Sequence, residues 1–148
     1  MTEPLHVAFE VRCVSDHAFE VWTTRIATWW PADHSVSGNP ETIVLEPRVG
    51  GRMYERSPDG TEHDWGEITL WEPPRGFAYR WHLGRDRGAA TDVQIRFEEL
   101  GPTTTRIVIE HYGWDHLGVG AENWRDRNRV GWETLLPHFR TAIERGAI

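Results

Sequence analysis

Lysine is missing from this sequence. All 16 basic residues are arginine, they face 23 acidic residues, and the formal net charge is −7. Without lysine, Schiff-base chemistry, a lysine nucleophile and a Walker-type phosphate-binding lysine are excluded. The acidic balance also argues against nucleic acid or an anionic membrane as the main partner.

Cysteine is nearly missing too. Cys13 is the single cysteine, which excludes an internal disulfide, a CxxC redox pair and a zinc cage of several thiolates. The sequence shows no basic-apolar leader and no apolar run near ~18 residues, so we expect a soluble cytoplasmic protein that does not use a membrane. Its 148 residues contain no repeat or linker-like stretch, and we expect residues 1–148 to form a single domain.

Motifs for nucleophilic and nucleotide chemistry are absent as well. No serine lies in a GxSxG elbow, and Cys13 falls in an expected strand, where a buried thiol is inert. The Gly50-Gly51 pair precedes an expected strand rather than a helix N-terminus, so it is not a phosphate loop. The sequence therefore indicates neither a nucleotide site nor a cofactor.

Eight histidines make metal binding worth weighing. Histidines and acids gather in two expected loops, with His111, Asp115 and His116 in one and Asp33 and His34 in the other. No HxxxH or HExxH pair lies on an expected helix, and a metal site needs three or four convergent ligands. We expect no metal.

The residue in excess is tryptophan, of which there are nine. Trp81 lies in an alternating segment and Trp132 on the apolar face of an expected helix, so both should point into the same space. Large aromatic side chains dominate core packing, and these two residues fit either core or the wall of a pocket. Trp29 and Trp30 are adjacent, so one of them should be partly exposed or lie at a pocket mouth, where Pro31 fixes the exit of the chain.

Alternation and turn residues predict a β-rich chain with helices near both ends. Residues 5–14 alternate as an opening strand, and Ser15 and Asp16 can cap a short helix that breaks up before Pro31. Turns are expected at 58–60, 84–88 and 101–102. The further expected strands are 42–46, 52–56, 64–71, 77–83, 91–97 and 105–112.

A long helix is predicted from about residue 121 to residue 145. Its apolar positions recur at spacings of three and four, which is typical of an amphipathic helix that covers one face of a sheet. Its inner face would carry Trp124, Asn128, Trp132, Leu135, Phe139 and Ile143. Short turns make neighbouring strands antiparallel. The order predicts an α+β domain in which six to seven strands curve around the long helix and leave a cavity.

Several short phrases occur along nearly the whole chain in an order that resembles the SRPBCC (START-like) superfamily. They are Phe19-Glu20-Val21-Trp22, Trp29-Trp30-Pro31, Val49-Gly50-Gly51-Arg52, Trp65-Gly66-Glu67-Ile68, Glu72-Pro73-Pro74-Arg75, Tyr79-Arg80-Trp81, Thr105-Arg106-Ile107, His111-Tyr112-Gly113 and Gly131-Trp132. Within the superfamily, they most resemble the family named for homologues of the activator of the heat-shock-protein-ninety ATPase.

The resemblance implies a helix-grip fold with a hydrophobic pocket between sheet and helix. It implies little about chemistry, because members of the superfamily bind lipids, sterols and polyketides, and some are cyclases or hydrolases. Chaperone activation is not expected, since such co-chaperones usually carry a second domain for which this chain has no residues left.

Candidate ligand contacts come from the expected inner faces. His111 would face inward near Trp114 and could orient a ligand oxygen or act as acid or base, or else be a core histidine whose ring is satisfied by the backbone. Arg52 and Tyr54 share a strand face and could hold a carboxylate, although a solvated face is the simpler interpretation of Arg52. The full candidate set is Arg52, Tyr54, Phe77, Tyr79, Trp81, His111, Trp114, Trp132, Leu135 and Trp30.

Three functions remain open, with ligand binding favoured over catalysis. The first is a module that binds a small hydrophobic, aromatic or lipid-like ligand. The second is a cyclase, dehydratase or hydrolase that uses His111 and Glu67 as weak acid–base candidates, although a cross-strand ion pair to Arg52 or Arg80 explains Glu67 equally well. The third is an interaction protein that docks a partner or forms a homodimer through an exposed Trp29-Trp30 corner.

Overall fold

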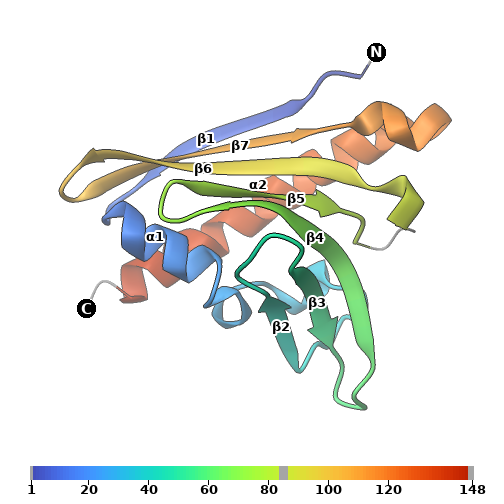
Figure 1. The fold of residues 1–148 in the computed structure, drawn as a ribbon, viewed down its shortest axis with the longest axis horizontal. Helices are drawn as coiled ribbons and strands as arrows, with labels where there is room; N and C mark the ends of the chain where they lie inside the picture. The colour runs from blue at the N-terminus through green and yellow to red at the C-terminus, as the bar shows by residue number, and fades with distance from the viewer. Residues whose placement is uncertain (1, 84–86, 147–148) are drawn as a thin grey trace.

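Seven antiparallel strands form one curved sheet in the computed structural model, which describes residues 2–83 and 87–146 (Figure 1). The strand order is β1-β7-β6-β5-β4-β3-β2, so strands that follow one another in sequence are neighbours, except that β1 lies beside β7. The strands are β1 (Leu5–Val11), β2 (Thr42–Leu45), β3 (Arg52–Arg56), β4 (Glu62–Glu72), β5 (Gly76–Trp81), β6 (Thr91–Gly101) and β7 (Thr104–Tyr112).

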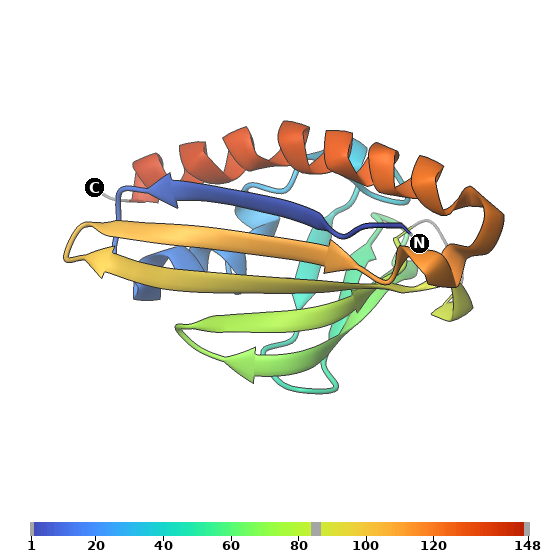
Figure 2. The same cartoon turned by 90° about the horizontal axis from the view of Figure 1, so that it is seen from above.

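One long helix runs along one face of this sheet (Figure 2). It ends the described part of the chain, and the shorter helical segments lie in the connections that precede it. These are α1 (Ser15–Trp22), η1 (Ile26–Thr28), η2 (Ala32–His34), η3 (Arg87–Ala89) and η4 (Trp114–Gly120), and the long helix is α2 (Ala121–Gly146). In the described part of the chain, none of the helices has the length and apolar character needed to cross a membrane.

The helix-grip architecture predicted from the sequence is confirmed. On α2, the inner positions Trp132, Leu135, Phe139 and Ile143 are all buried. On β7, the alternating positions that were expected to face the helix, from Thr105 to His111, are buried as well. The 3.6-residue period of the helix and the two-residue period of the strand thus meet across one interior.

Two irregularities bend the sheet. The pairing register shifts between Met53 and Tyr54 on β3 and between Ile68 and Leu70 on β4, and such bulges increase local twist. Gly66 lies at the bend, where a Cβ would overlap the carbonyl oxygen of Arg80 on the next strand. Only glycine permits this close approach, which turns β3 and β4 around the helix.

Some expected boundaries are wrong. The opening strand ends at Val11 rather than at residue 14, so Cys13 lies beyond it, although it is buried and burial raises the pKa of its thiol. The expected cap on α1 is also wrong, because Val14 occupies the N-cap position and no described side chain caps that end. Of the expected turn at 84–88, residues 84–86 lie outside the described residues.

Of the two placements expected for the Trp29-Trp30 pair, the exposed corner is wrong, because both residues are buried, whereas Trp30 does line a partly open cavity. The two rings lie against each other in the interior, with centroids 5.6 Å apart. Trp29 donates its indole N–H to the carbonyl of Val21 at 2.8 Å and packs in the core. Trp30 turns toward Trp81, with the two ring centroids 6.0 Å apart.

Candidate ligand-binding site

A cavity of about 350 Å³ lies where the end of β5 and the loop around η2 meet the first half of α2. It is partly open to solvent, and its lining is mostly apolar with a few polar groups, as in typical small-molecule sites. The lining residues are Trp30, Asp33, His34, Ser35, Trp81, Leu83, Trp124, Arg127, Asn128, Gly131, Trp132 and Leu135.

The sheet side of the cavity is an aromatic wall. Trp65 packs behind both lining rings, 5.2 Å from Trp30 and 5.8 Å from Trp81 between ring centroids. The indole N–H of Trp30 donates to the carbonyl of His34 at 3.0 Å. Because its ring is packed and hydrogen-bonded, Trp30 offers a fixed flat surface at little entropic cost to a ligand.

The helix side of the cavity follows the period of α2. Asn128 donates from Nδ2 to the carbonyl of Trp124 at 2.8 Å, which leaves its Oδ1 as an acceptor for a ligand. The guanidinium carbon of Arg127 lies 4.6 Å from the ring centroid of Trp124, within cation–π range. The helix therefore supplies the rings of Trp124 and Trp132, one neutral acceptor and one permanent positive charge.

His34 ties the loop wall to the helix. Its Nδ1 lies 2.8 Å from Asp33 Oδ1 and its Nε2 lies 2.9 Å from the hydroxyl of Thr134. That hydroxyl also lies 3.0 Å from the carbonyl of Gly131. Both ring nitrogens of His34 therefore have a partner, one in the loop and one on the helix. The hydrogen bond and charge of His34 hold the pKa of Asp33 below its usual value.

His111 lies behind the cavity in a chain of hydrogen bonds. The indole N–H of Trp132 can only donate, and it reaches Nδ1 of His111 at 3.1 Å, so the proton of the neutral ring is on Nε2. Nε2 donates to the hydroxyl of Thr91 at 2.7 Å, and that hydroxyl donates to the carbonyl of Trp81 at 3.3 Å. The two opposite walls are thus linked through a fully buried histidine.

Glu55 holds the loop that follows η2, and the sequence analysis missed it. Its carboxylate accepts the backbone N–H of Val36 at 2.5 Å, the hydroxyl of Ser37 at 2.6 Å and the indole N–H of Trp65 at 2.8 Å. Burial alone raises the pKa of Glu55, but these bonds outweigh it and the net pKa is lowered. In the sequence Glu55 sits in an alternating strand like any exposed glutamate, so no signal marks it.

Only some of the expected ligand contacts meet at the cavity. Trp30, Trp81, Trp132 and Leu135 line it. The other aromatic candidates do not line it. Phe77 and Tyr79 are buried in the packed core. Trp114 packs against His111 and donates its indole N–H to the backbone carbonyl of that residue at 2.9 Å. His111 is a core histidine, as one interpretation expected, but its ring partners are side chains rather than backbone.

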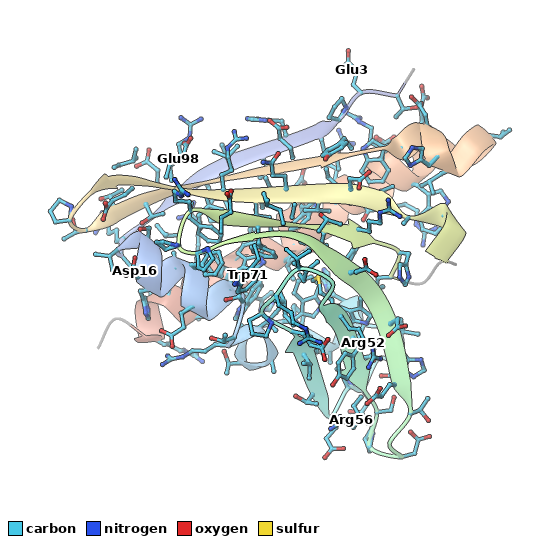
Figure 3. All side chains as sticks on the ribbon, in the orientation of Figure 1. Glu3, Asp16, Arg52, Arg56, Trp71 and Glu98 are labelled. Atoms are coloured by element: carbon cyan, nitrogen blue, oxygen red, sulfur yellow. The ribbon has the colours of Figure 1, made fainter. Side chains whose placement is uncertain are left out.

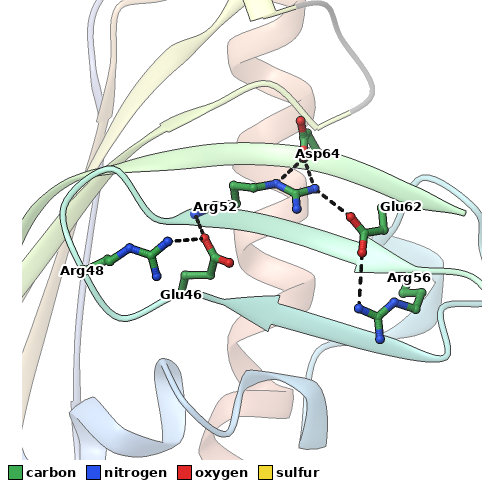
Figure 4. Close-up of polar contacts among 6 residues, drawn as sticks. All are labelled: Glu46, Arg48, Arg52, Arg56, Glu62 and Asp64. Atoms are coloured by element: carbon green, nitrogen blue, oxygen red, sulfur yellow. Dashed lines mark hydrogen bonds and ion pairs between the residues drawn. The ribbon is translucent and has the colours of Figure 1, made fainter. Parts of the chain in front are cut away.

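Arg52 and Tyr54 lie on a different part of the molecule. Figure 3 shows Arg52 and Arg56 together on the β3 strand, far from α1. The Arg52 guanidinium lies 4.1 Å from the Tyr54 ring centroid and 2.7 Å from Asp64, and Glu62 bridges it to Arg56 (Figure 4). The charge that was expected to hold a ligand carboxylate is therefore occupied by carboxylates of the chain.

Glu67 is exposed and does not line the cavity. It faces Arg52 and Arg80 across the neighbouring strands, as the sequence analysis expected. However, the guanidinium of Arg52 reaches Asp64 and Glu62 instead. No group of three histidine, cysteine or acidic side chains suited to a metal ion occurs among the described residues.

The missed lining residues belong to two classes. Trp124 and Asn128 were expected on the inner face of the helix, but not as ligand contacts. Asp33, His34 and Arg127 come from a loop and from the border of that face, where periodicity carries no information. For the loop pair, the adjacent acid and histidine next to Trp30 is the signal that could have indicated a site.

Comparison with solved structures finds similar chains. One is an anthrahydroquino-gamma-pyrone synthase, Txn09, with 33% sequence identity and a TM-score of 0.60 over 82% of this chain and 84% of that one. Another is a self-sacrificing resistance protein, CalC from Micromonospora echinospora, with 26% identity and a TM-score of 0.73 over 97% and 95% of the two chains. CalU16 from the same organism shares the fold at 20% identity and a TM-score of 0.67, over 95% and 73%. No protein-family model and no curated protein matches the chain.

Proposed function

This chain belongs to the SRPBCC (START-like) superfamily, and on that premise we propose that it binds a flat aromatic small molecule that carries an acidic or hydroxyl oxygen. The observation that carries the proposal is the gathering of Trp30, Trp81, Trp124 and Trp132 around one partly open cavity. Flat rings stack favourably on such faces, and indoles with fixed positions lose little entropy on binding.

The size of the cavity favours a compact ring system. About 350 Å³ lies at the low end of the ~300–1,000 Å³ typical of small-molecule sites. A fused aromatic system of two or three rings suits this space better than a long acyl chain.

The polar groups at the mouth favour an acidic oxygen on the ligand. Arg127 offers positive charge, and Asn128 offers an acceptor. A carboxylate or an ionised phenol can face Arg127 while a neutral hydroxyl donates to Asn128. Asp33 is already engaged by His34, so it repels an anion less than a free carboxylate would.

The similar proteins support the same ligand class. A chain with 33% identity is named as an anthrahydroquino-gamma-pyrone synthase, and that name describes a fused-ring aromatic compound. Within the superfamily, we propose the family named for homologues of the activator of the heat-shock-protein-ninety ATPase as the finer assignment, because the quoted sequence phrases resemble it.

A second candidate function is acid catalysis in the same cavity. Two observations favour it, namely the synthase named above and the Asp33–His34 pair, which puts an imidazole held by a carboxylate in the lining. His111 is a poor acid–base group in comparison, because it is fully buried behind the cavity and does not line it. A ligand that binds and is converted to a product, with conversion lost in His34→Gln while binding persists, would support catalysis.

The test of binding uses tryptophan fluorescence. Alizarin, 2-naphthoate and dodecanoate are titrated into the wild type, Trp81→Leu and Trp132→Leu, with Trp71→Leu as a matched control, because Trp71 lines a separate surface groove. We expect saturable quenching by the two aromatic probes and about tenfold weaker binding in the two cavity variants, equivalent to about 1.4 kcal/mol. Equal affinity in all four proteins, or no saturation by either aromatic probe, would contradict the proposal.

A further inference from the structure

No feature of the backbone conformation requires a glycine at position 131. It lies inside α2, where glycine destabilises a helix relative to alanine. It is not among the residues with positive φ, so its backbone is accessible to any residue. A Cβ built on it would meet no heavy atom of the described residues within 4 Å, apart from its chain neighbours and the backbone of its own helix turn.

Several other glycines have evident causes. A side chain at Gly66 or Gly51 would overlap backbone carbonyl oxygens, and Gly60 has a φ of 90° in the turn between β3 and β4. Neither cause applies to Gly131. What distinguishes Gly131 is its location, because it lies in the cavity lining next to Trp132.

We propose that Gly131 is the residue that sets the size and flatness of the ligand, because its missing side chain opens a slot along α2 for the edge of a fused aromatic ring. This inference rests on the proposed function and adds a residue that determines specificity. Asn128 and Leu135 lie three positions before and four positions after Gly131, on the same helix face, and they bound the slot. Trp132 flanks it with its ring held by His111.

The location of the slot also determines the orientation of the ligand. Asn128 supplies an acceptor at one end, next to the turn that carries Arg127, and Leu135 closes the other end with an apolar side chain. An aromatic system with its oxygen substituents at one end fits this polarity. A three-ring system reaches past Gly131, whereas a two-ring system can remain between Trp30 and Trp81.

The proposal predicts changes of opposite sign in stability and binding. Gly131→Ala removes the helix penalty and adds a methyl group to the slot, so the melting temperature should rise by about 2–4 °C while alizarin binding weakens. Gly131→Met fills the slot with a flexible apolar chain, and alizarin affinity should fall by at least about tenfold. The smaller 2-naphthoate should lose less affinity than alizarin in both variants.

The experiment measures melting temperature and the affinity for alizarin and 2-naphthoate in the wild type, Gly131→Ala and Gly131→Met. Val130→Met is the matched control, since Val130 is the adjacent helix residue, is 54% exposed and does not line the cavity. We expect its affinities to equal those of the wild type.

Each outcome decides the matter. Wild-type affinity for alizarin in Gly131→Met would overturn the role of Gly131 and leave the proposed function standing. A melting temperature below that of the wild type in Gly131→Ala, or an equal loss of affinity in Val130→Met, would also overturn it. Failure of the wild type to bind either probe would overturn both the proposed function and this inference.

Discussion

The interior of this protein has two aromatic regions that differ in how α2 meets the sheet. Toward the end of α2, Phe139 packs against Trp22 and Trp29 with ring centroids 4.7 and 5.2 Å away. Toward its start, Trp124 and Trp132 stand across a cavity from the sheet. We refer to these as the closed end and the open end.

The comparison teaches that tryptophan alone does not indicate a pocket. At the closed end, α1 lies between sheet and helix and its Trp22 has no exposed surface. At the open end, a loop held by His34 and Glu55 replaces a helix, and α2 presents Gly131 where a side chain would fill the space. The same residue type is core in one place and wall in the other because of what lies between the layers.

The largest expected effect comes from truncation at the closed end. Phe139→Ala removes a fully buried ring from a packed cluster, and we expect a loss of about 3–5 kcal/mol in the free energy of unfolding. Trp124→Ala at the open end should cost about 1 kcal/mol or less, because that ring is only half-buried and borders an existing space. Urea denaturation measures both, and similar losses would show that the two ends do not differ in packing.

The next effect concerns the loop that makes the open end. Glu55→Gln replaces a carboxylate that accepts several N–H and O–H donors, so we expect a loss of about 1.5–3 kcal/mol. Since the folded pKa of Glu55 is lowered, its contribution is present above the unfolded pKa of about 4.3 and is lost as pH falls through the folded value.

The direction of this pH dependence can be tested by measuring stability at two pH values. Urea denaturation at pH 7 and at pH 3.5 should show a smaller gap between wild type and Glu55→Gln at the lower pH. Glu67→Gln, an exposed change on the neighbouring strand, is the control and should leave stability nearly unchanged. A gap that widens at low pH would contradict the assignment of an ionised Glu55.

A smaller loss is expected behind the cavity. His111→Phe keeps an aromatic ring but removes the partners of Trp132 and Thr91, and we expect it to cost about 1–3 kcal/mol. Saturable binding of alizarin should persist, weakened by less than about tenfold, because His111 positions Trp132 without lining the cavity. Complete loss of binding in a variant that still unfolds cooperatively would assign His111 a direct ligand contact.

The smallest effect is expected at the mouth. Arg127→Gln removes a charge that stacks on Trp124, and we expect 2-naphthoate, which is anionic, to bind about three- to tenfold more weakly, or about 1 kcal/mol. A neutral analogue, 2-naphthol at pH 7, should lose less affinity. Arg129→Gln is the matched control, since that arginine lies near Asp126 and outside the lining. An equal effect of both substitutions on 2-naphthoate would indicate that only the overall electrostatic field of the protein acts on the ligand, without a local contribution from Arg127.

Periodicity explains why the fold was accessible from the sequence. The inner residues of α2 follow its 3.6-residue period, and every second residue of β7 from Thr105 to His111 is buried, so the layers and the faces could be assigned. Burial does not alternate on β3, where Met53, Tyr54 and Glu55 are buried in succession.

The site was only partly accessible for the same physical reason. Trp81 and Trp132 lie on periodic elements and both line the cavity, whereas His34 and Glu55 act through contacts between distant segments. His34 meets Thr134 a hundred positions later in the chain, and no local pattern encodes that meeting. The solvated strand face favoured for Arg52 agrees with its partly exposed side chain, but its acidic partner Asp64 is defined by the strand pairing and could not be predicted.

The most direct test of the central claim follows the indole N–H signals of the nine tryptophans by ¹H–¹⁵N NMR during a titration with alizarin. The account predicts that the largest shifts belong to the four lining residues, Trp30, Trp81, Trp124 and Trp132, while Trp22 and Trp29 of the closed end stay in place. Assignment by single Trp→Phe variants identifies each signal. Shifts concentrated at Trp71, or spread evenly over all nine signals, would contradict the claim that the open end is the binding site.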